Sequence, residues 1–81
     1  MMDFGDAIRA LKQGKRVARQ GWNGKGMWLV LLYPESDMHR SPAGTYPMLK
    51  CIGIKTADNL VQPGWLASQT DMLAEDWSLV A

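Results

Sequence analysis

The stretch Met27-Trp28-Leu29-Val30-Leu31-Leu32-Tyr33 is apolar throughout and decides the fold of this chain. Glycine-rich sequence precedes it and Pro34 follows it. A short continuous apolar run bounded by turn residues, with β-branched and aromatic side chains, is typical of a buried strand. The sequence therefore predicts a central strand of a sheet over residues 27–33.

Upstream of this strand, an amphipathic helix is expected over residues 3–13. Apolar residues recur at helical spacing from Phe4 to Leu11 and form one stripe. Asp3 is a favourable capping residue at the start, and Gly14 is a favourable stop. The helix would therefore cover one face of the sheet.

The rest of the chain predicts short strands, one loop and a second helix. Residues 34–47 contain three prolines, which favour an irregular loop. Ser68 and Asp71 form a Ser-x-x-Asp capping pattern that begins a short helix over 69–74. The further strands are expected over residues 15–19, 48–55, 60–62 and 77–80. The predicted fold is α+β: a small antiparallel β-sheet with an N-terminal helix and a short C-terminal helix, in a single domain over residues 1–81.

Size and composition restrict how this domain is stabilised. In a chain of 81 residues, burial of apolar surface and the entropy of ordering nearly cancel, so small domains usually need a further stabilising device. Cys51 is the one cysteine and His39 the one histidine, which excludes an intramolecular disulfide and a four-ligand zinc site. Cys51 is expected in the core. We expect no metal, no cofactor and self-association.

Charge and hydropathy point to a class of protein. The formal net charge is +1, whereas general DNA binders carry a clear basic excess. No apolar run reaches the length of a membrane span, and the first residues do not resemble a secretory signal. We therefore expect a soluble protein in a reducing, cytoplasmic compartment, with neither DNA nor a membrane as its partner.

A glycine-rich turn is the first candidate binding segment. Gly21-Trp22-Asn23-Gly24-Lys25-Gly26 permits backbone N–H groups to converge on an anion, and Lys25 adds charge. An ordinary hairpin connection explains the glycines equally well. Trp22 favours a site, because a large aromatic at a turn tip is costly in water unless it stacks on a ligand or packs on a partner.

The second candidate segment runs from Pro63 to Asp71. Trp65 precedes the N-terminus of the predicted helix, where free N–H groups and the helix dipole favour a phosphate. Ser68, Thr70 and Asp71 carry groups that bind ribose hydroxyls or a base edge. The alternative is that Ser68 and Asp71 only cap the helix while Trp65 fills the core. The other two tryptophans, Trp28 and Trp77, are assigned to the core.

Catalytic groups are scarce in this sequence. His39 lies in the proline-rich loop with nothing to orient it as a catalytic base. Paired carboxylates occur at Glu35 with Asp37 and at Glu75 with Asp76, but adjacent acids of this kind are usually solvated. No catalytic residue is predicted.

Both candidate segments lie in stretches that resemble one family. The resembling stretches are Phe4 to Ala7 and Leu11 to Lys15, then Val17-Ala18-Arg19-Gln20-Gly21-Trp22-Asn23-Gly24-Lys25-Gly26-Met27-Trp28, and Trp65-Leu66-Ala67-Ser68-Gln69-Thr70-Asp71-Met72-Leu73-Ala74-Glu75-Asp76-Trp77. In these the chain resembles the Thoeris anti-defence protein two family of phages. Residues 34–64 carry little of the resemblance.

The resemblance implies a molecular sponge. Members of this family bind glycocyclic ADP-ribose isomers made by TIR-domain enzymes of Thoeris defence without cleaving them, and some also bind cyclic oligonucleotides of CBASS defence. They form homo-oligomers, commonly tetramers, with pockets between protomers. Carried over, stacking would fall to Trp22 and Trp65, phosphate or ribose contact to Asn23, Gly24 and Lys25, and the rest of the pocket to Ser68, Thr70 and Asp71.

Three functional hypotheses follow from the sequence. The first is a non-enzymatic sponge for a cyclic nucleotide signal, acting as a homo-oligomer in the cytoplasm of an infected bacterium. The second is a small phosphodiesterase or glycohydrolase that uses Asp71 or Glu75. The third is a protein-interaction module whose exposed tryptophans dock a partner chain.

Overall fold

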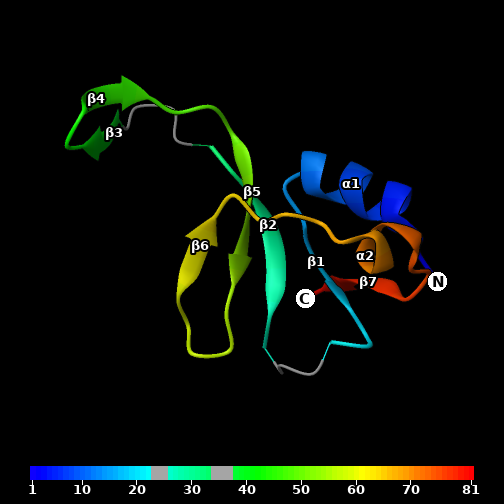
Figure 1. The fold of residues 1–81 in the computed structure, drawn as a ribbon. Helices are drawn as coiled ribbons and strands as arrows, with labels where there is room; N and C mark the ends of the chain where they lie inside the picture. The colour runs from blue at the N-terminus through cyan, green and yellow to red at the C-terminus, as the bar shows by residue number, and fades with distance from the viewer. Residues whose placement is uncertain (23–25, 34–37) are drawn as a thin grey trace.

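The computed structural model describes residues 1–22, 26–33 and 38–81 as two helices and seven strands (Figure 1). The first helix packs on one side of a five-stranded antiparallel sheet of order β6-β5-β2-β1-β7, and a separate hairpin pairs β3 with β4. This confirms the α+β prediction. The elements are α1 Phe4–Lys12, β1 Arg16–Arg19, β2 Trp28–Leu32, β3 Met38–Ser41, β4 Gly44–Pro47, β5 Cys51–Lys55, β6 Val61–Pro63, α2 Gln69–Leu73 and β7 Trp77–Val80.

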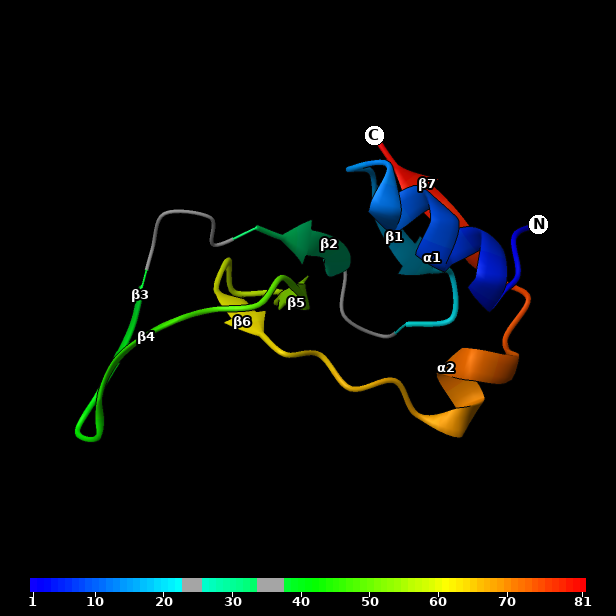
Figure 2. The ribbon, with the colours of Figure 1, turned by 90° about the horizontal axis from the view of Figure 1, so that it is seen from above.

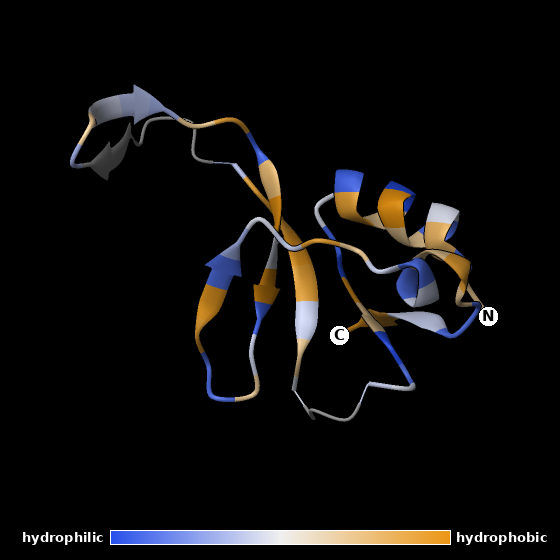
Figure 3. Cartoon of the chain, in the orientation of Figure 1, coloured by the Kyte–Doolittle hydropathy of each residue, from blue (hydrophilic) through white to orange (hydrophobic). Residues whose placement is uncertain are grey.

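The apolar stretch forms β2, which is the middle strand of the sheet, as predicted. Figure 3 shows β2 as mainly hydrophobic along its length. It pairs with β1 through Val17 and Leu29, and with β5 from Trp28 opposite Lys55 to Leu32 opposite Cys51. Both halves of the sheet are therefore joined through β2.

The local signals at both ends of α1 are confirmed. Asp3 and Asp6 form a capping box, in which each carboxylate accepts a hydrogen bond from the other residue's backbone N–H. At the other end Gly14 adopts φ +82°, a left-handed conformation that glycine adopts without a steric penalty. These two signals set the length of the helix.

The core lies between α1 and the β2-β1-β7 part of the sheet. Trp77 is 1% exposed and Val17 and Leu29 are fully buried, so the assignment of Trp77 to the core is confirmed. The other buried apolar residues of the described chain are Ala7, Ala10 and Leu11, which all belong to α1. In Figure 2 α1 lies in front of β1 and β7, at a distance from the β5–β6 part of the sheet.

Two core assignments were wrong. Trp28 is only half-buried, because its ring lies on the sheet surface with the Arg16 guanidinium 5.0 Å from its centroid. This is the geometry of a cation–π contact, which needs one ring face open to the cation. Cys51 is also half-buried, as a free thiol at the start of β5.

The expectation of a loop over residues 34–47 was also wrong in its second part, where β3 and β4 form a hairpin. Residues 34–37 lie outside the described residues. Ser41 pairs with Gly44, so Pro42 occupies the turn, and Pro47 ends β4. Proline is compatible with turns and strand ends, where no ladder hydrogen bond is lost. The prolines therefore delimit the hairpin and do not prevent it.

The remaining strands and the second helix are close to their predicted positions. β7 occupies residues 77–80 as expected, but it is an edge strand of the sheet. Its Trp77 also forms an isolated bridge with Met2. β5 starts at Cys51, later than expected, and α2 ends one residue early at Leu73.

Candidate functional site

Both candidate segments lie beside Trp77 and meet through aromatic packing. Trp22 follows β1 and Trp65 precedes α2, and both are half-buried against the core. Their ring centroids lie 6.4 Å apart, and each contacts Trp77 edge-on, at 5.5 Å and 6.2 Å. We call these three residues the tryptophan cluster. Such edge-to-face pairs are favourable beyond the area they bury, so the cluster fixes the two segments relative to each other.

The tryptophans therefore combine two of the roles considered from the sequence. Trp22 and Trp65 help to close the core, yet both remain partly exposed, whereas Trp77 is buried beneath them. Trp22 is not a free aromatic at a turn tip, because its indole packs on Trp77. Stacking on a ligand by Trp22 and Trp65 stays a prediction.

An ionic network joins the same two segments. The Arg19 side chain donates from Nε to Oδ1 of Asp76 and from Nη1 to Oδ1 of Asp71, both at 2.9 Å. The backbone N–H of Gly21 donates to Oδ2 of Asp76 at 2.8 Å. The three side chains are only 14–23% exposed. Arg19 therefore ties the end of β1 to α2 and to the start of β7.

The charges in this network stabilise one another. The Arg19 hydrogen bond is the main cause that holds the pKa of Asp76 below its usual value, and the Gly21 N–H adds to it against the effect of burial. For Asp71, burial raises the pKa, but hydrogen bonds from Ser68, Arg19 and Trp22 outweigh it and leave the pKa lowered. The pKa of Arg19 is raised, chiefly by Asp76 and then by Asp71.

Asp71 has a second task at the start of α2. Its Oδ2 accepts hydrogen bonds from the Ser68 backbone and hydroxyl at 3.1 Å and 2.9 Å, and the Ser68 hydroxyl accepts from the Asp71 N–H at 3.1 Å. This is the capping box that the sequence pattern indicated. Both carboxylate oxygens of Asp71 thus have partners within the chain. Contact of Ser68 and Asp71 with a ligand stays a prediction.

Of the other candidate residues, only Thr70 lies within the described part of the chain. Thr70 is exposed in the first turn of α2. The predictions for Asn23, Gly24 and Lys25 lie outside the described residues. Gly26, the next described residue, adopts φ +80°.

Lys55 is a cation that the sequence analysis missed. It lies in β5 opposite Trp28, and its Nζ donates to the carbonyl oxygen of Gly26 at 2.8 Å. A positive charge from a distant strand therefore stands beside the glycine-rich turn. The pairing of β2 with β5 would have indicated this contact, but the register is not evident from the sequence.

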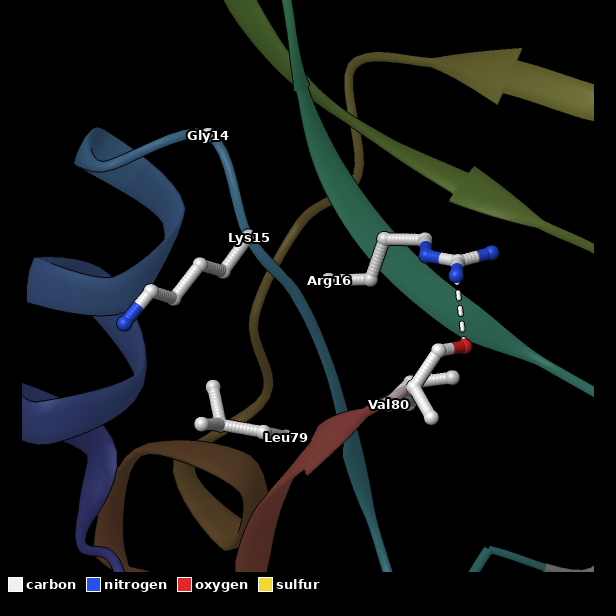
Figure 4. Close-up of a pocket in the computed structure, with 6 residues that line it drawn as sticks. Gly14, Lys15, Arg16, Leu79 and Val80 are labelled. Carbon is white, nitrogen blue, oxygen red and sulfur yellow. Dashed lines mark hydrogen bonds between the residues drawn. The ribbon is translucent and has the colours of Figure 1, made fainter.

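A separate hollow lies where β1 and β7 meet the end of α1. It has a volume of about 390 Å³ and is lined by residues 14–16 and 79–81. In Figure 4 Lys15 points toward α1, whereas Arg16 points across β2. Arg16 donates to the carbonyl oxygen of Ala81 at 2.5 Å and lies over Trp28. The two cations do not converge, and none of the predicted ligand-binding residues lines this hollow.

The described residues provide little catalytic machinery. Among them no group of three metal-binding side chains is found. Asp71 and Asp76 are held as ion-paired carboxylates, and Glu75 is exposed. Glu35 and Asp37 lie outside the described residues, and His39 lies on β3. No helix within the described chain is long and apolar enough to cross a membrane.

Comparison with known proteins places the chain in a family. The family model for the Thoeris anti-defense 2-like domain matches residues 2–80. A protein named Thoeris anti-defense 2, from Bacillus phage SP01, is 47% identical over 88 residues, which cover 99% of this chain and 96% of the relative. The chain therefore belongs to the Thoeris anti-defense 2-like family, whose name marks a role against bacterial defence.

Proposed function

We propose that this chain is a phage anti-defence protein that binds a cyclic nucleotide immune signal and holds it without cleaving it. The single observation that carries this proposal is the match of the chain, along almost its whole length, to the anti-defence family. The signal is a glycocyclic ADP-ribose isomer made by a TIR enzyme. Cyclic oligonucleotides of CBASS defence are a second class to be tested.

The geometry of the candidate site supports a nucleotide-like ligand. Trp22 and Trp65 lie side by side and are partly exposed, as stacking surfaces for flat bases must be. Lys55 stands at the glycine-rich turn and supplies positive charge for a phosphate. Asn23, Gly24 and Lys25 would add phosphate or ribose contacts from the same turn, and Thr70 a hydroxyl from α2.

The ionic network contributes order to this site. Because Arg19 holds Asp71 and Asp76 at once, the turn after β1 and the helix α2 are fixed before any ligand arrives. A preorganised site loses less conformational entropy on binding and so binds more tightly. Tight binding is what sequestration requires, since each site removes one signal molecule. The chain would act as a homo-oligomer, a tetramer, in the cytoplasm of the infected bacterium.

Titration calorimetry of the purified full chain tests this proposal. Glycocyclic ADP-ribose isomers and cyclic dinucleotides form the panel, and linear ADP-ribose is the matched control for ring closure. We expect saturable, stoichiometric binding of at least one cyclic ligand. Heating the complex should then release the ligand intact, as measured by mass spectrometry. Absence of binding across the panel would refute a small-ligand sponge and favour the protein-interaction module.

The enzyme hypothesis predicts a different result in the same samples. An acid catalyst at Asp71 would have to release its proton near neutral pH, whereas the Ser68 and Arg19 contacts keep this carboxyl ionised. Incubation with a tenfold excess of ligand distinguishes the two cases. A sponge leaves the excess unchanged, and a phosphodiesterase or glycohydrolase that uses Asp71 or Glu75 converts all of it to product.

A further inference from the structure

Asp71 is the point at which the tryptophan cluster and the ionic network meet. Its carboxylate accepts hydrogen bonds from Arg19 at the end of β1, from Ser68 before α2 and from the side chain of Trp22, whose donor is the indole N–H. Its backbone carbonyl oxygen accepts a hydrogen bond from Nε1 of Trp77 at 3.0 Å. The N–H groups of two indoles of the cluster therefore end on the same residue.

These two hydrogen bonds act on how the rings are turned. An indole turns about its Cα–Cβ and Cβ–Cγ bonds, and a hydrogen bond to Nε1 fixes a second point of the ring. The rings of Trp22 and Trp77 have centroids 5.5 Å apart and are inclined at 78°. Because both are bonded to Asp71, this residue helps to set the angle between them. A base stacks only on a ring whose face is presented to it.

The carboxylate of Asp71 has little capacity left for a ligand. An ionised carboxylate has about four acceptor positions. The N–H and hydroxyl of Ser68, Nη1 of Arg19 and the indole of Trp22 together fill these positions. The Asp71 side chain is also only 14% exposed. A ribose hydroxyl would therefore have to displace one of these partners in order to bind it.

The negative charge of Asp71 strengthens its hold on Trp22. Its partners keep the pKa of this carboxyl below its usual value against the effect of burial, so it is ionised at neutral pH. A hydrogen bond to an ionised group is roughly twice as strong as one between neutral groups. An asparagine has nearly the same volume, but its NH2 group is a donor and would face the donors of the partners. Asp71→Asn therefore weakens this hold with little change of shape.

We propose that Asp71 is a positioning residue of the ligand site, which orients the Trp22 ring for stacking and does not itself bind the ligand. This inference rests on the proposed function and separates the stacking surface from the residue that orients it. The sequence suggested instead that Asp71 binds ribose hydroxyls or a base edge. The two roles predict different results, because the effect of a positioning residue must pass through Trp22.

The indole N–H resonances test the orientation of Trp22 in the free chain. In two-dimensional proton–nitrogen NMR spectra, Asp71→Asn should move the Nε1–H signal of Trp22 upfield, because the proton loses its charged acceptor. Asp58→Asn, in the exposed turn between β5 and β6, makes the same change of charge and should leave that signal in place. An unmoved Trp22 signal in folded Asp71→Asn would overturn the inference.

The unchanged chain supplies a second measurement if Asp71→Asn does not fold. The indole N–H of Trp22 should exchange with heavy water at least about tenfold more slowly than that of N-acetyltryptophanamide, since a hydrogen bond to a charged group must open first. Trp22 is partly exposed, so solvent reaches its ring. Exchange as fast as in the free amide would also overturn the proposal.

Calorimetry with a glycocyclic ADP-ribose isomer then distinguishes positioning from contact. Asp71→Asn should weaken binding about tenfold, which corresponds to the loss of one hydrogen bond to a charged group. Trp22→Phe keeps an aromatic face but lacks the N–H donor, so adding Asp71→Asn to it should weaken binding by less than about twofold. An equal loss in both backgrounds would show that Asp71 binds the ligand and would contradict the inference. If no form binds, the proposed function fails, whereas the Trp22 resonance decides the inference without ligand.

Discussion

The two halves of the sheet differ in what covers them. β7, β1 and β2 lie beneath α1, and the most deeply buried apolar side chains of the described chain belong to these four elements. β5 and β6, the open half of the sheet, have no helix of the described chain over them (Figure 2), and all three residues of β6 are exposed. The core therefore lies in the covered half, whereas β6 in the open half is exposed to solvent.

The two halves of the sheet are therefore expected to differ in how much they contribute to the stability of the chain. The tryptophan cluster and the ionic network lie at the covered half, where packing can hold a site in place. The β3–β4 hairpin lies between β2 and β5 in the sequence and outside the five-stranded sheet. The predictions below test this division.

The largest difference in the free energy of unfolding is expected between substitutions of one side chain from each half of the sheet. Leu29→Ala removes a fully buried side chain of β2 and should lower the free energy of unfolding by about 2–5 kcal/mol. Val61→Ala, on β6, removes a side chain that is 50% exposed and should cost about 0.5 kcal/mol or less. Urea unfolding followed by tryptophan fluorescence measures both. Similar losses would show that the open half is as tightly packed as the covered one.

Ligand binding should depend on the tryptophan cluster and not on Trp28, the tryptophan outside it. Trp22→Ala removes a predicted stacking surface and should weaken binding of the cyclic ligand by about 1–3 kcal/mol, which is roughly 5- to 150-fold in Kd. Trp28→Ala is the matched control, because Trp28 lies outside the cluster with Arg16 over its ring. Calorimetry on variants shown to be folded measures the difference. Unchanged affinity in Trp22→Ala would remove this residue from the site.

One position of the open half is expected to be tightly packed. A Cβ at Gly53 would stand 2.6 Å from Cδ1 and 3.0 Å from Cγ of Leu32. Gly53→Ala should therefore lower the free energy of unfolding by about 1–3 kcal/mol through overpacking. Gly5→Ala in α1 is the control, where the new Cβ meets its nearest atom at 3.4 Å and the helix should gain up to about 1 kcal/mol. We expect Gly53→Ala to lower the free energy of unfolding and Gly5→Ala to raise it, as measured by urea unfolding.

The ionic network predicts a loss of stability in acid. Asp71 and Asp76 have a lower pKa in the folded chain than the usual value of about 3.9 in an unfolded one. Their stabilising effect is therefore complete only well above the unfolded value, from about pH 5 upward, and is lost as the pH falls through the folded-state values. The Tm of the chain should fall in that window.

Substitution of the shared cation identifies the source of this acid sensitivity. Arg19→Met should flatten the dependence of Tm on pH below about pH 5, because both carboxylates lose a main partner. Arg9→Met removes only the exposed pair with Asp6 and should flatten it much less. Differential scanning calorimetry from pH 2.5 to 7 measures the slopes. Identical slopes in all three proteins would show that the network does not control the effect.

The sequence predicted what depends on local signals. The Asp3 cap of α1, the Gly14 stop, the central strand over 28–32 and the strand over 77–80 each follow from residue type and spacing over a few positions. The hairpin in the proline-rich segment was missed because proline disfavours strands on average. Here its two prolines occupy a turn and a strand end, where that average does not apply.

The candidate site was predicted only as two separate segments. The residues of the two segments singled out Trp22 and Trp65, and the family resemblance gave them a stacking role. Their packing on Trp77, however, depends on the pairing of β1 with β7. The partners of Arg19 lie 52 and 57 residues away in sequence, and Lys55 reaches its turn only through the β2–β5 register. A pattern of neighbouring residues cannot predict contacts between residues so far apart in sequence. The ionic network and the contact of Lys55 are therefore known only from the tertiary structure.

The position of Trp77 in the last strand has a consequence for how the chain folds. Its backbone pairs with Met2, its ring packs on Phe4, and its side chain is at the centre of the cluster. Contacts between such distant residues form late, because closing a long loop of chain costs entropy before any contact is gained. On the ribosome, this core cannot close until β7 has emerged. The protein should therefore become resistant to proteases in one late, cooperative step and not strand by strand.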